Sequence, residues 1–269
     1  MSFVERYGPW AVVTGASSGI GRQFATVLAE RGLSVVITAR RKDRLDHLAA
    51  ELTSKHGVQV QVLELDLTAA GFLEILLGAT ADKDIGLVVS NAGFGLKGLH
   101  HVQERERLDS MLNVNVRAPT LIAQAYSPGL IKRGRGGLLL TGSLEGFLSM
   151  PWSAAYAATK AFVHSLGEAL WAELSPHGVD VLVLAPGATD TEAAGLQGMD
   201  TKQIRNVMPP RQVALTTLDR LRDGPTYLPG AMNRAMVRVL TLLPKRWAIT
   251  MAGKGTKAAL DKAAAGRNS

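Results

Sequence analysis

The chain has 269 residues, of which 46% are hydrophobic and 20% charged, and its net charge is +7. These proportions are typical of a globular protein with an ample core, and the absence of cysteine excludes disulfides, thiolate nucleophiles and cysteine-bound metals. The positive charge belongs to the C-terminal region: from Thr201 onward there are 13 Lys or Arg against three Asp or Glu, leaving 17 against 20, a net charge of −3, before it. A basic tail on a slightly acidic body argues against nucleic-acid binding.

The first residues of the chain lack the apolar stretch of a signal peptide. No run in the sequence approaches the roughly 18 apolar residues that a membrane-spanning helix needs. We therefore expect a cytoplasmic protein that binds, at most, the surface of a membrane.

Strands and helices are predicted to alternate along most of the chain. Short apolar runs predict strands over Trp10–Thr14, Ser34–Ala39, Gln59–Leu65, Leu87–Ser90, Gly137–Thr141, Val179–Ala185 and, more briefly, Thr226–Leu228. Helical spacing of apolar residues predicts helices over Ile20–Arg31, Leu45–His56, about Glu104 to Arg133, and Ala154–Ser175. This alternation indicates a doubly wound α/β fold, in which a parallel sheet is covered by helices on both faces.

The last third of the chain is less regular. We expect an insertion over about 189–224 that covers the substrate, and a C-terminal extension over about 231–262. In this extension Ala231–Leu243 and Arg246–Leu260 are predicted as basic helices. They fit a lid over a pocket, a contact with an anionic membrane, or helices simply packed on the body. No linker or repeat divides residues 1–269, so we expect a single domain.

A glycine-rich turn, Thr14-Gly-Ala-Ser-Ser-Gly-Ile-Gly21, joins the first strand to the first helix. Its three glycines let backbone N–H groups approach an anion at the helix N-terminus, where such sheets bind a dinucleotide pyrophosphate. About 20 residues later, Ala39 stands where NAD-binding sheets place a carboxylate, and Arg40 and Arg41 follow it. Guanidinium groups can bind a 2′-phosphate, with Ser17 as a helper, so NADP(H) is preferred over NAD(H).

Tyr156 and Lys160 lie four residues apart, on one face of a predicted helix. The ammonium group would lower the pKa of the phenol and let it exchange a proton near neutral pH. Ser143, Asn91 and Pro186–Gly187 each follow a different predicted strand. Because the carboxyl ends of parallel strands meet at one edge of the sheet, we expect these residues to surround one ligand.

The whole set of motifs resembles the short-chain dehydrogenase/reductase superfamily over about Trp10 to Thr191. The motifs are TGASSGIG at Thr14–Gly21, NAG at Asn91–Gly93, YAATK at Tyr156–Lys160 and PGATDT at Pro186–Thr191, together with Asn115 and Ser143. The segments YGPWAVVTGASSGIG and YAATKAFV are similar to reductases of the 17β-hydroxysteroid and long-chain 3-ketoacyl type. Those reductases commonly carry a membrane-spanning N-terminus, which this sequence does not show.

The resemblance implies a Rossmann-type sheet of about seven strands and a role for each catalytic residue. Tyr156 would transfer the proton, and Ser143 would orient and polarise the substrate oxygen. Lys160 would bind the nicotinamide ribose and lower the pKa of Tyr156. Asn115 would kink its helix and hold a water in a proton relay to Lys160. A homodimer or homotetramer is also implied.

The same resemblance implies a cofactor site in which Asp66 would contact the adenine amino group. Its members are Gly15, Ser17, Ser18, Gly19, Ile20, Gly21, Arg40, Arg41, Asp66, Leu67, Asn91, Ala92, Gly93, Tyr156, Lys160, Pro186, Gly187, Thr189 and Thr191. No metal is expected, because the pair His100–His101 lacks neighbouring carboxylates in a ligand pattern and fits a solvated loop.

The substrate candidates are Ser143, Glu145, Trp152 and Tyr156. Apolar neighbours (Phe94, Leu144, Phe147 and Met150) would line a lipophilic pocket, although ordinary loop packing explains any one of them equally well. We therefore expect an NADP(H)-dependent oxidoreductase that interconverts a ketone or aldehyde and an alcohol. The alternative is a dinucleotide-binding regulator without turnover.

Overall fold

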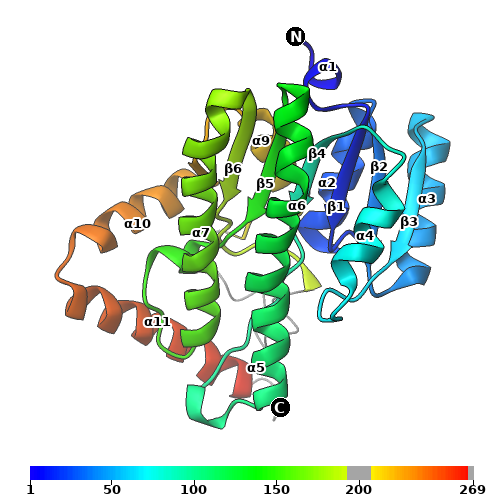
Figure 1. Ribbon diagram of the computed structural model, residues 1–269. Helices are drawn as coiled ribbons and strands as arrows, with labels where there is room; N and C mark the ends of the chain where they lie inside the picture. Colours follow the sequence, from blue (N-terminus) through cyan, green and yellow to red (C-terminus); the bar gives the residue numbers. More distant parts are fainter. Residues whose placement is uncertain (193–206, 266–269) are drawn as a thin grey trace.

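Seven parallel strands form one sheet in the order β3-β2-β1-β4-β5-β6-β7 (Figure 1). The computed structural model describes residues 1–192 and 207–265. The strands are β1 (Trp10–Thr14), β2 (Ser34–Ala39), β3 (Val60–Glu64), β4 (Ile85–Ser90), β5 (Gly136–Thr141), β6 (Val179–Leu184) and β7 (Thr226–Tyr227). The strand order reverses between β1 and β4, which is where doubly wound sheets bind their ligands. The predicted Rossmann-type α/β fold is confirmed.

Helices cover both faces of this sheet. One face carries α2 (Gly19–Glu30), α3 (Lys42–His56) and α9 (Pro210–Asp219), and the other carries α4 (Phe72–Thr80), α6 (Ala118–Arg133) and α7 (Ala154–Leu174). Successive strand residues point to opposite cores: Val13 packs in the cluster of Phe24, and Val12 in that of Phe72. Burial on both faces explains why the central strands β1, β4 and β5 are largely apolar along their length.

The long helix predicted from about Glu104 is built in three parts. It consists of α5 (Arg105–Leu112), a π-helical turn η2 (Asn113–Arg117) and then α6. Shorter turns are η1 (His100–Val102), η3 (Leu144–Phe147) and η4 (Ser175–His177). A π-helical turn inside an α-helix often marks a functional position.

Three helices have no counterpart among the predicted elements: α1 (Phe3–Tyr7), α4 and α9. The first is too short for a periodic pattern, and Tyr7 fixes it by donating a 2.6 Å hydrogen bond to Asp180 in β6. The predicted insertion over 189–224 contains α9, which packs on α2 and buries Val213 and Leu218 in the core. Residues 193–206 lie outside the described residues, so a substrate cover there stays a prediction.

The C-terminal extension forms the two predicted helices, α10 (Ala231–Leu242) and α11 (Lys245–Ala265). They project from the left side of the molecule in Figure 1 as a bent pair. Val237 of α10 is buried against Leu144 and Phe147 of η3. Across 1–192 and 207–265, every helix is too short or too polar to cross a bilayer.

Candidate active site

The glycine-rich turn forms a cradle that fits a pyrophosphate. Gly15 and Gly19 adopt left-handed φ values of +69° and +57°, which favour glycine. A Cβ at Gly21 would overlap the Gly15 carbonyl oxygen and the Asn91 amide nitrogen. The 12-residue helix α2 begins at Gly19, and no side chain caps its N-terminus. Its N–H groups and dipole can therefore meet an anion, as the predicted cofactor requires.

Asn91 fastens this turn to the neighbouring strand. Its Nδ2 donates to the Thr14 carbonyl oxygen at 3.1 Å. The backbone N–H groups of Asn91 and Ala92 both donate to Thr14 Oγ1 at 3.0 Å. A Cβ added to the exposed Gly93 would lie 3.2 Å from both Lys160 Nζ and Asn115 Oδ1. The NAG motif thus connects the phosphate turn to the predicted catalytic residues.

The two arginines after β2 differ in their partners. Arg41 donates to the hydroxyls of Ser17 and Ser18, at 3.0 and 2.8 Å, and pairs with Glu192 at 2.8 Å. Arg40 is exposed and makes no hydrogen bond or ion pair within the described parts of the chain. The guanidinium of Arg40 is therefore the one that is available to a 2′-phosphate at the rim of the turn.

Asp66, the predicted adenine contact, follows β3 on the same edge of the sheet. Its Oδ1 accepts hydrogen bonds from the backbone N–H and the hydroxyl of Thr68, at 2.9 and 2.8 Å. Burial raises the pKa of this carboxyl group, but the Thr68 hydrogen bonds and the charge of Arg40 outweigh it and lower the pKa. Asp66 is therefore held as a carboxylate, the form that accepts from an amino group.

The segment after β6 closes over the same turn. A Cβ at Gly19 would lie 3.0 Å from the Thr191 methyl group, so the two residues are adjacent. Thr189 forms a bridge with Met208, and the Pro186 carbonyl oxygen accepts from Leu144 N at 2.9 Å. The predicted residues of this segment thus lie between the phosphate turn and η3.

Asn115 sits in the π-helical turn, where it is almost fully buried. Its Nδ2 donates to the Phe94 carbonyl oxygen at 2.8 Å and to Thr159 Oγ1 at 3.1 Å, and its Oδ1 accepts from Phe94 N at 3.1 Å. The widened turn thereby joins the loop after β4 to α7.

Lys160 is also buried, and its Nζ donates to the Thr141 carbonyl oxygen at 2.7 Å. Burial lowers the pKa of Lys160 to about 8. Its Nζ lies 5.7 Å from the centroid of the half-buried Tyr156 ring, and Ser143 is close enough to the Tyr156 hydroxyl to lower its pKa. Lys160, Tyr156 and Ser143 are therefore together at one edge of the sheet.

The expected lowering of the Tyr156 pKa by Lys160 does not occur in the chain alone. Burial and then the Glu145 carboxylate raise the pKa of Tyr156, because both disfavour the phenolate, and the Ser143 hydrogen bond only partly opposes them. Lys160 is engaged by Thr141 and lies to the side of the ring. The nearby Glu145 charge was not anticipated from the sequence.

His164 is a residue of the site that the sequence reading missed. The backbone N–H of Ser143 donates to its Nε2 at 3.4 Å, and the Phe147 ring contacts it edge-on with centroids 4.5 Å apart. Burial lowers the pKa of His164 to about 4, so the ring is neutral and can accept this hydrogen bond. Its position four residues after Lys160, on the same helix face, is the signal that could have revealed it.

Glu145 and Trp152, the predicted substrate contacts, both have protein partners. Both carboxylate oxygens of Glu145 accept from Lys97 Nζ, at 2.5 and 2.7 Å. Trp152 has a left-handed φ of +60°, and its carbonyl oxygen accepts from Gly98 N at 2.8 Å. A Cβ at Gly253 of α11 would lie 3.1 Å from the Trp152 ring, so α11 packs against this residue.

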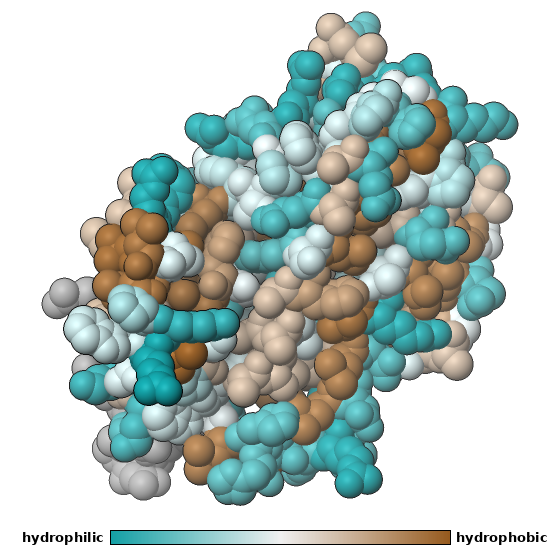
Figure 2. Space-filling model, turned by 60° about the vertical axis from the view of Figure 1, so that its left-hand side comes forward, coloured by the Kyte–Doolittle hydropathy of each residue, from teal (hydrophilic) through white to brown (hydrophobic). Residues whose placement is uncertain are grey.

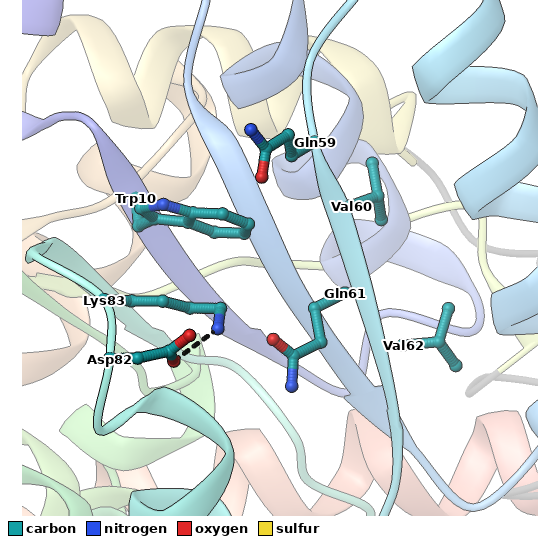
Figure 3. A pocket seen from close by; sticks show the side chains of 7 residues that line it. All are labelled: Trp10, Gln59, Val60, Gln61, Val62, Asp82 and Lys83. Carbon is teal, nitrogen blue, oxygen red and sulfur yellow. Dashed lines mark hydrogen bonds and ion pairs between the residues drawn. The ribbon is translucent and has the colours of Figure 1, made fainter.

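A separate groove lies at the amino ends of β1 and β3, away from these residues (Figure 3). It is lined by Trp10, Gln59, Val60, Gln61, Val62, Asp82 and Lys83. The Lys83 ammonium pairs with Asp82 at 2.6 Å and lies 5.2 Å from the Trp10 ring centroid. His100 and His101 are exposed in η1 and belong to neither place.

Comparisons with known proteins agree with this geometry. The sequence model of the family described as short chain dehydrogenase matches residues 9–201. The chain is 32% identical to a 7β-hydroxysteroid dehydrogenase of Clostridium sardiniense over 255 residues, which cover 94% of this chain and 98% of that protein. A short-chain dehydrogenase from Sphingobium yanoikuyae, solved in complex with NADPH, is 33% identical with a TM-score of 0.78, covering 88% and 96% of the two chains. A solved 7β-hydroxysteroid dehydrogenase has a TM-score of 0.87 at 27% identity, covering 94% and 99%.

Proposed function

The chain belongs to the short-chain dehydrogenase family and is an NAD(P)-dependent oxidoreductase, and we propose that it reduces a bulky, lipophilic ketone with NADPH. The observation that carries this proposal is the meeting of Tyr156, Ser143 and Lys160 at the edge of the sheet beside the glycine-rich turn. A regulator that only binds a dinucleotide does not need a tyrosine beside a buried lysine next to the glycine-rich turn.

Preference for NADPH is supported by the rim of the turn. Arg40 makes no hydrogen bond or ion pair with the described residues and can bind a 2′-phosphate, whereas Arg41 is already held by Ser17, Ser18 and Glu192. The NADPH complex of the Sphingobium yanoikuyae relative supports the same preference. Bound NADPH supplies the hydride that reduces the carbonyl carbon.

Side chains of the protein would then bind and protonate the substrate oxygen. Ser143 donates a hydrogen bond to it, which orients and polarises the carbonyl, and Tyr156 gives it a proton. Lys160 binds the ribose and supports the ionised phenol left behind. Asn115, fixed by Phe94 and Thr159, holds the π-helical turn open for a water that returns the proton.

The apolar side chains beside η3 and Trp152 support a bulky apolar substrate. Leu144 and Phe147 of η3 pack with Val237 of α10, and α11 lies against Trp152. The C-terminal helices therefore stand at the substrate side of the site. The 7β-hydroxysteroid dehydrogenases among the relatives act, by their names, on a hydroxyl group of a steroid. We infer a steroid-like ketone as the first substrate class to test.

The outer surface of the C-terminal helices supports a second role, a contact with anionic membranes. Leu242 is 81% exposed and Trp247 67% exposed. Figure 2, which brings the left side of Figure 1 forward, shows apolar groups gathered at the surface among hydrophilic ones. Arg238, Lys245 and Arg246 are exposed in the same stretch, so its charge is complementary to anionic lipid.

A homo-oligomer stays a prediction from the family. Phe162 and Trp171 of α7 are 41% and 39% exposed, which supports pairing of this helix with that of a second copy. Light scattering during size-exclusion chromatography would give the mass, and Trp171→Ser should lower it if α7 forms the interface.

The test of the proposed activity follows NADPH absorbance with purified protein and a panel of carbonyls: steroid ketones, 3-oxoacyl thioesters, aromatic aldehydes and sugars. We expect the fastest turnover with a steroid ketone, a preference for NADPH over NADH, and a loss of about 10²–10⁴-fold in Tyr156→Phe. Tight NADPH binding without any turnover would favour the regulator. Failure to bind either dinucleotide would overturn the proposal.

A further inference from the structure

A buried ion pair lies directly beside Tyr156 and outside the set of residues that the mechanism uses. Lys97 Nζ contacts the two carboxylate oxygens of Glu145 at 2.5 and 2.7 Å, and the side chain of Lys97 is only 3% exposed. Ser153 completes the group: its hydroxyl accepts from Lys97 at 2.8 Å and donates to Glu145 at 2.5 Å. All three donors of the ammonium are thus satisfied within the protein.

This group joins the loop after β4 to the two segments that carry Ser143 and Tyr156. Lys97 lies in the loop after β4. Glu145 lies in η3, two residues after Ser143, and Ser153 is the N-cap of α7, three residues before Tyr156. An N-cap serine ordinarily accepts a hydrogen bond from its own helix, but Ser153 makes no such bond. Its hydroxyl is committed to the ion pair instead, so the start of α7 is fixed to the other two segments.

The pair also places opposite charges near the phenol. Lys97 Nζ lies 5.3 Å from the Tyr156 ring centroid, a distance similar to the 5.7 Å of Lys160 Nζ. The Glu145 carboxylate acts on the same ring and raises its pKa. From the remaining side, Ser143 offers a neutral hydrogen bond, and His164 behind it is uncharged above pH of about 4. Within residues 1–192 and 207–265, the charged groups that face the phenol are therefore Lys160 and this pair.

A buried ion pair is a weak source of stability, because its desolvation offsets most of the attraction. The presence of the ion pair at this position is better explained by its effect on the position and protonation of Tyr156. Either charge alone, in a site shielded from water, would shift the protonation of the phenol strongly. The Lys97 charge opposes that of Glu145 near the ring, and the hydrogen bonds of both to Ser153 hold the start of α7, the helix that carries Tyr156.

We propose that Lys97, Glu145 and Ser153 form a brace that positions Tyr156, and that the Lys97 ammonium in this brace offsets part of the Glu145 charge acting on the Tyr156 phenol. This proposal rests on the activity proposed above. The brace members are positioning residues, because they act through Tyr156 and do not touch the reacting atoms.

The experiment measures the pH dependence of kcat/KM for alcohol oxidation with NADP⁺ in Lys97→Met, Glu145→Gln and the double variant. Lys97→Met leaves Glu145 unopposed, so the rising limb of the profile should move up by about one pH unit. Glu145→Gln leaves Lys97 unopposed and should move it down by a similar amount. The double variant should return close to the wild-type profile, with a lower kcat.

Matched variants separate charge from structure. Lys97→Arg keeps the charge and should keep the wild-type profile. Ser153→Ala removes only the hydroxyl and should lower kcat without moving the profile. Lys83→Met removes another little-exposed lysine, which pairs with the exposed Asp82 in the distant groove, and should change neither.

Shifts in the same direction for Lys97→Met and Glu145→Gln, or no shift in either, would overturn the brace. A rise in KM alone for Glu145→Gln would also overturn it, since that result identifies Glu145 as a substrate contact. If Lys97→Met does not fold, Glu145→Gln against the double variant carries the same comparison.

A spectroscopic titration distinguishes failure of the brace from failure of the proposed activity. Tyrosinate absorbance of each variant in its NADP⁺ complex, minus that of the same variant carrying Tyr156→Phe, reports Tyr156 without any substrate. Ionisation should begin at the lowest pH in Glu145→Gln, then in the wild type, and last in Lys97→Met. Any other order contradicts the brace whether or not a ketone is reduced.

Discussion

The glycine-rich turn after β1 (Thr14–Gly21) and the C-terminal helices α10 and α11 are built differently. In the turn, backbone atoms approach so closely that a single added Cβ at Gly21 would overlap two neighbours. On the helices, Leu242 and Trp247 stand 81% and 67% exposed. The difference fits the roles proposed above, in which the turn binds the same cofactor in every turnover and the helices face a substrate or a membrane surface that can vary.

Gly21→Ala should have the largest effect, because it breaks the close packing of the turn. The new Cβ would overlap the Gly15 carbonyl oxygen and the Asn91 amide, neither of which can move without opening the link between β1 and β4. We expect NADPH affinity to fall by about 100-fold or more, with a loss of about 1–3 kcal/mol in unfolding free energy from overpacking. Fluorescence titration with NADPH and urea unfolding measure the two.

Gly78→Ala is the matched control in the same half of the protein. Gly78 lies within α4, and a Cβ there would meet nothing within 4 Å. The substitution should raise the unfolding free energy by about 0.5–1 kcal/mol and leave NADPH binding unchanged. Equal NADPH affinities in the two variants would contradict the account of a tightly packed turn.

Much of the fold was predictable because its strands are buried on both faces. The central strands β1, β4 and β5 are mostly apolar and buried, and glycines such as Gly57 end the helices in the left-handed conformation that favours this residue. The helix α4 lacked such signals: it follows Gly71 without a side-chain cap and is apolar over most of its length. Short α1 depends on the distant Asp180, which no local pattern reveals.

The residues of the candidate site also differ in whether the sequence could predict them. Residues such as Asn91 and Ser143 could be placed because each lies within two residues of the end of a strand, and the topology brings strand ends together. Lys97 and Glu145 are separated by 48 residues, and their contact depends on the path of the loop after β4. Loop paths follow from packing rather than from periodicity, so the ion pair had no sequence signal.

A second prediction concerns acid stability, which the buried site should control and the exposed helices should not. The folded protein holds the pKa of His164 near 4, below its ordinary 6.5, because burial disfavours the charged ring. The unfolded chain therefore binds more protons between these values. Stability due to His164 is complete above pH of about 6.5 and is lost as the pH falls toward 4, by at most about 3 kcal/mol.

Urea unfolding at several pH values, in wild type and His164→Gln, checks this window. Glutamine keeps an acceptor for the Ser143 N–H but cannot take up the proton. The variant should lose less unfolding free energy than the wild type on acidification. Parallel losses in the two proteins would show that His164 is not the group responsible.

Arg40→Ala should have a smaller and more selective effect on the cofactor side. Loss of one charge-assisted hydrogen bond to the 2′-phosphate costs about 1.5–3 kcal/mol, or about 10- to 100-fold in NADPH affinity. The affinity for NADH should not change. Arg44→Ala removes a nearby exposed arginine that pairs with Glu192, and it serves as the control. Equal losses for both dinucleotides in Arg40→Ala would exclude Arg40 from the phosphate site.

The smallest effect is expected on the outer face of the C-terminal helices. The double substitution of Leu242→Ser and Trp247→Ser should weaken binding to anionic phospholipid vesicles by about tenfold or more, because it removes apolar side chains that enter the interface. Binding should also fall with salt, since Arg238 and Lys245 would contribute by charge. Ile75→Ser, which changes a 51% exposed residue on α4, is the control. Equal binding to neutral and anionic vesicles would contradict an interaction with anionic lipid. A change of oligomeric state in the double variant would instead show that Leu242 and Trp247 contact another copy of the chain.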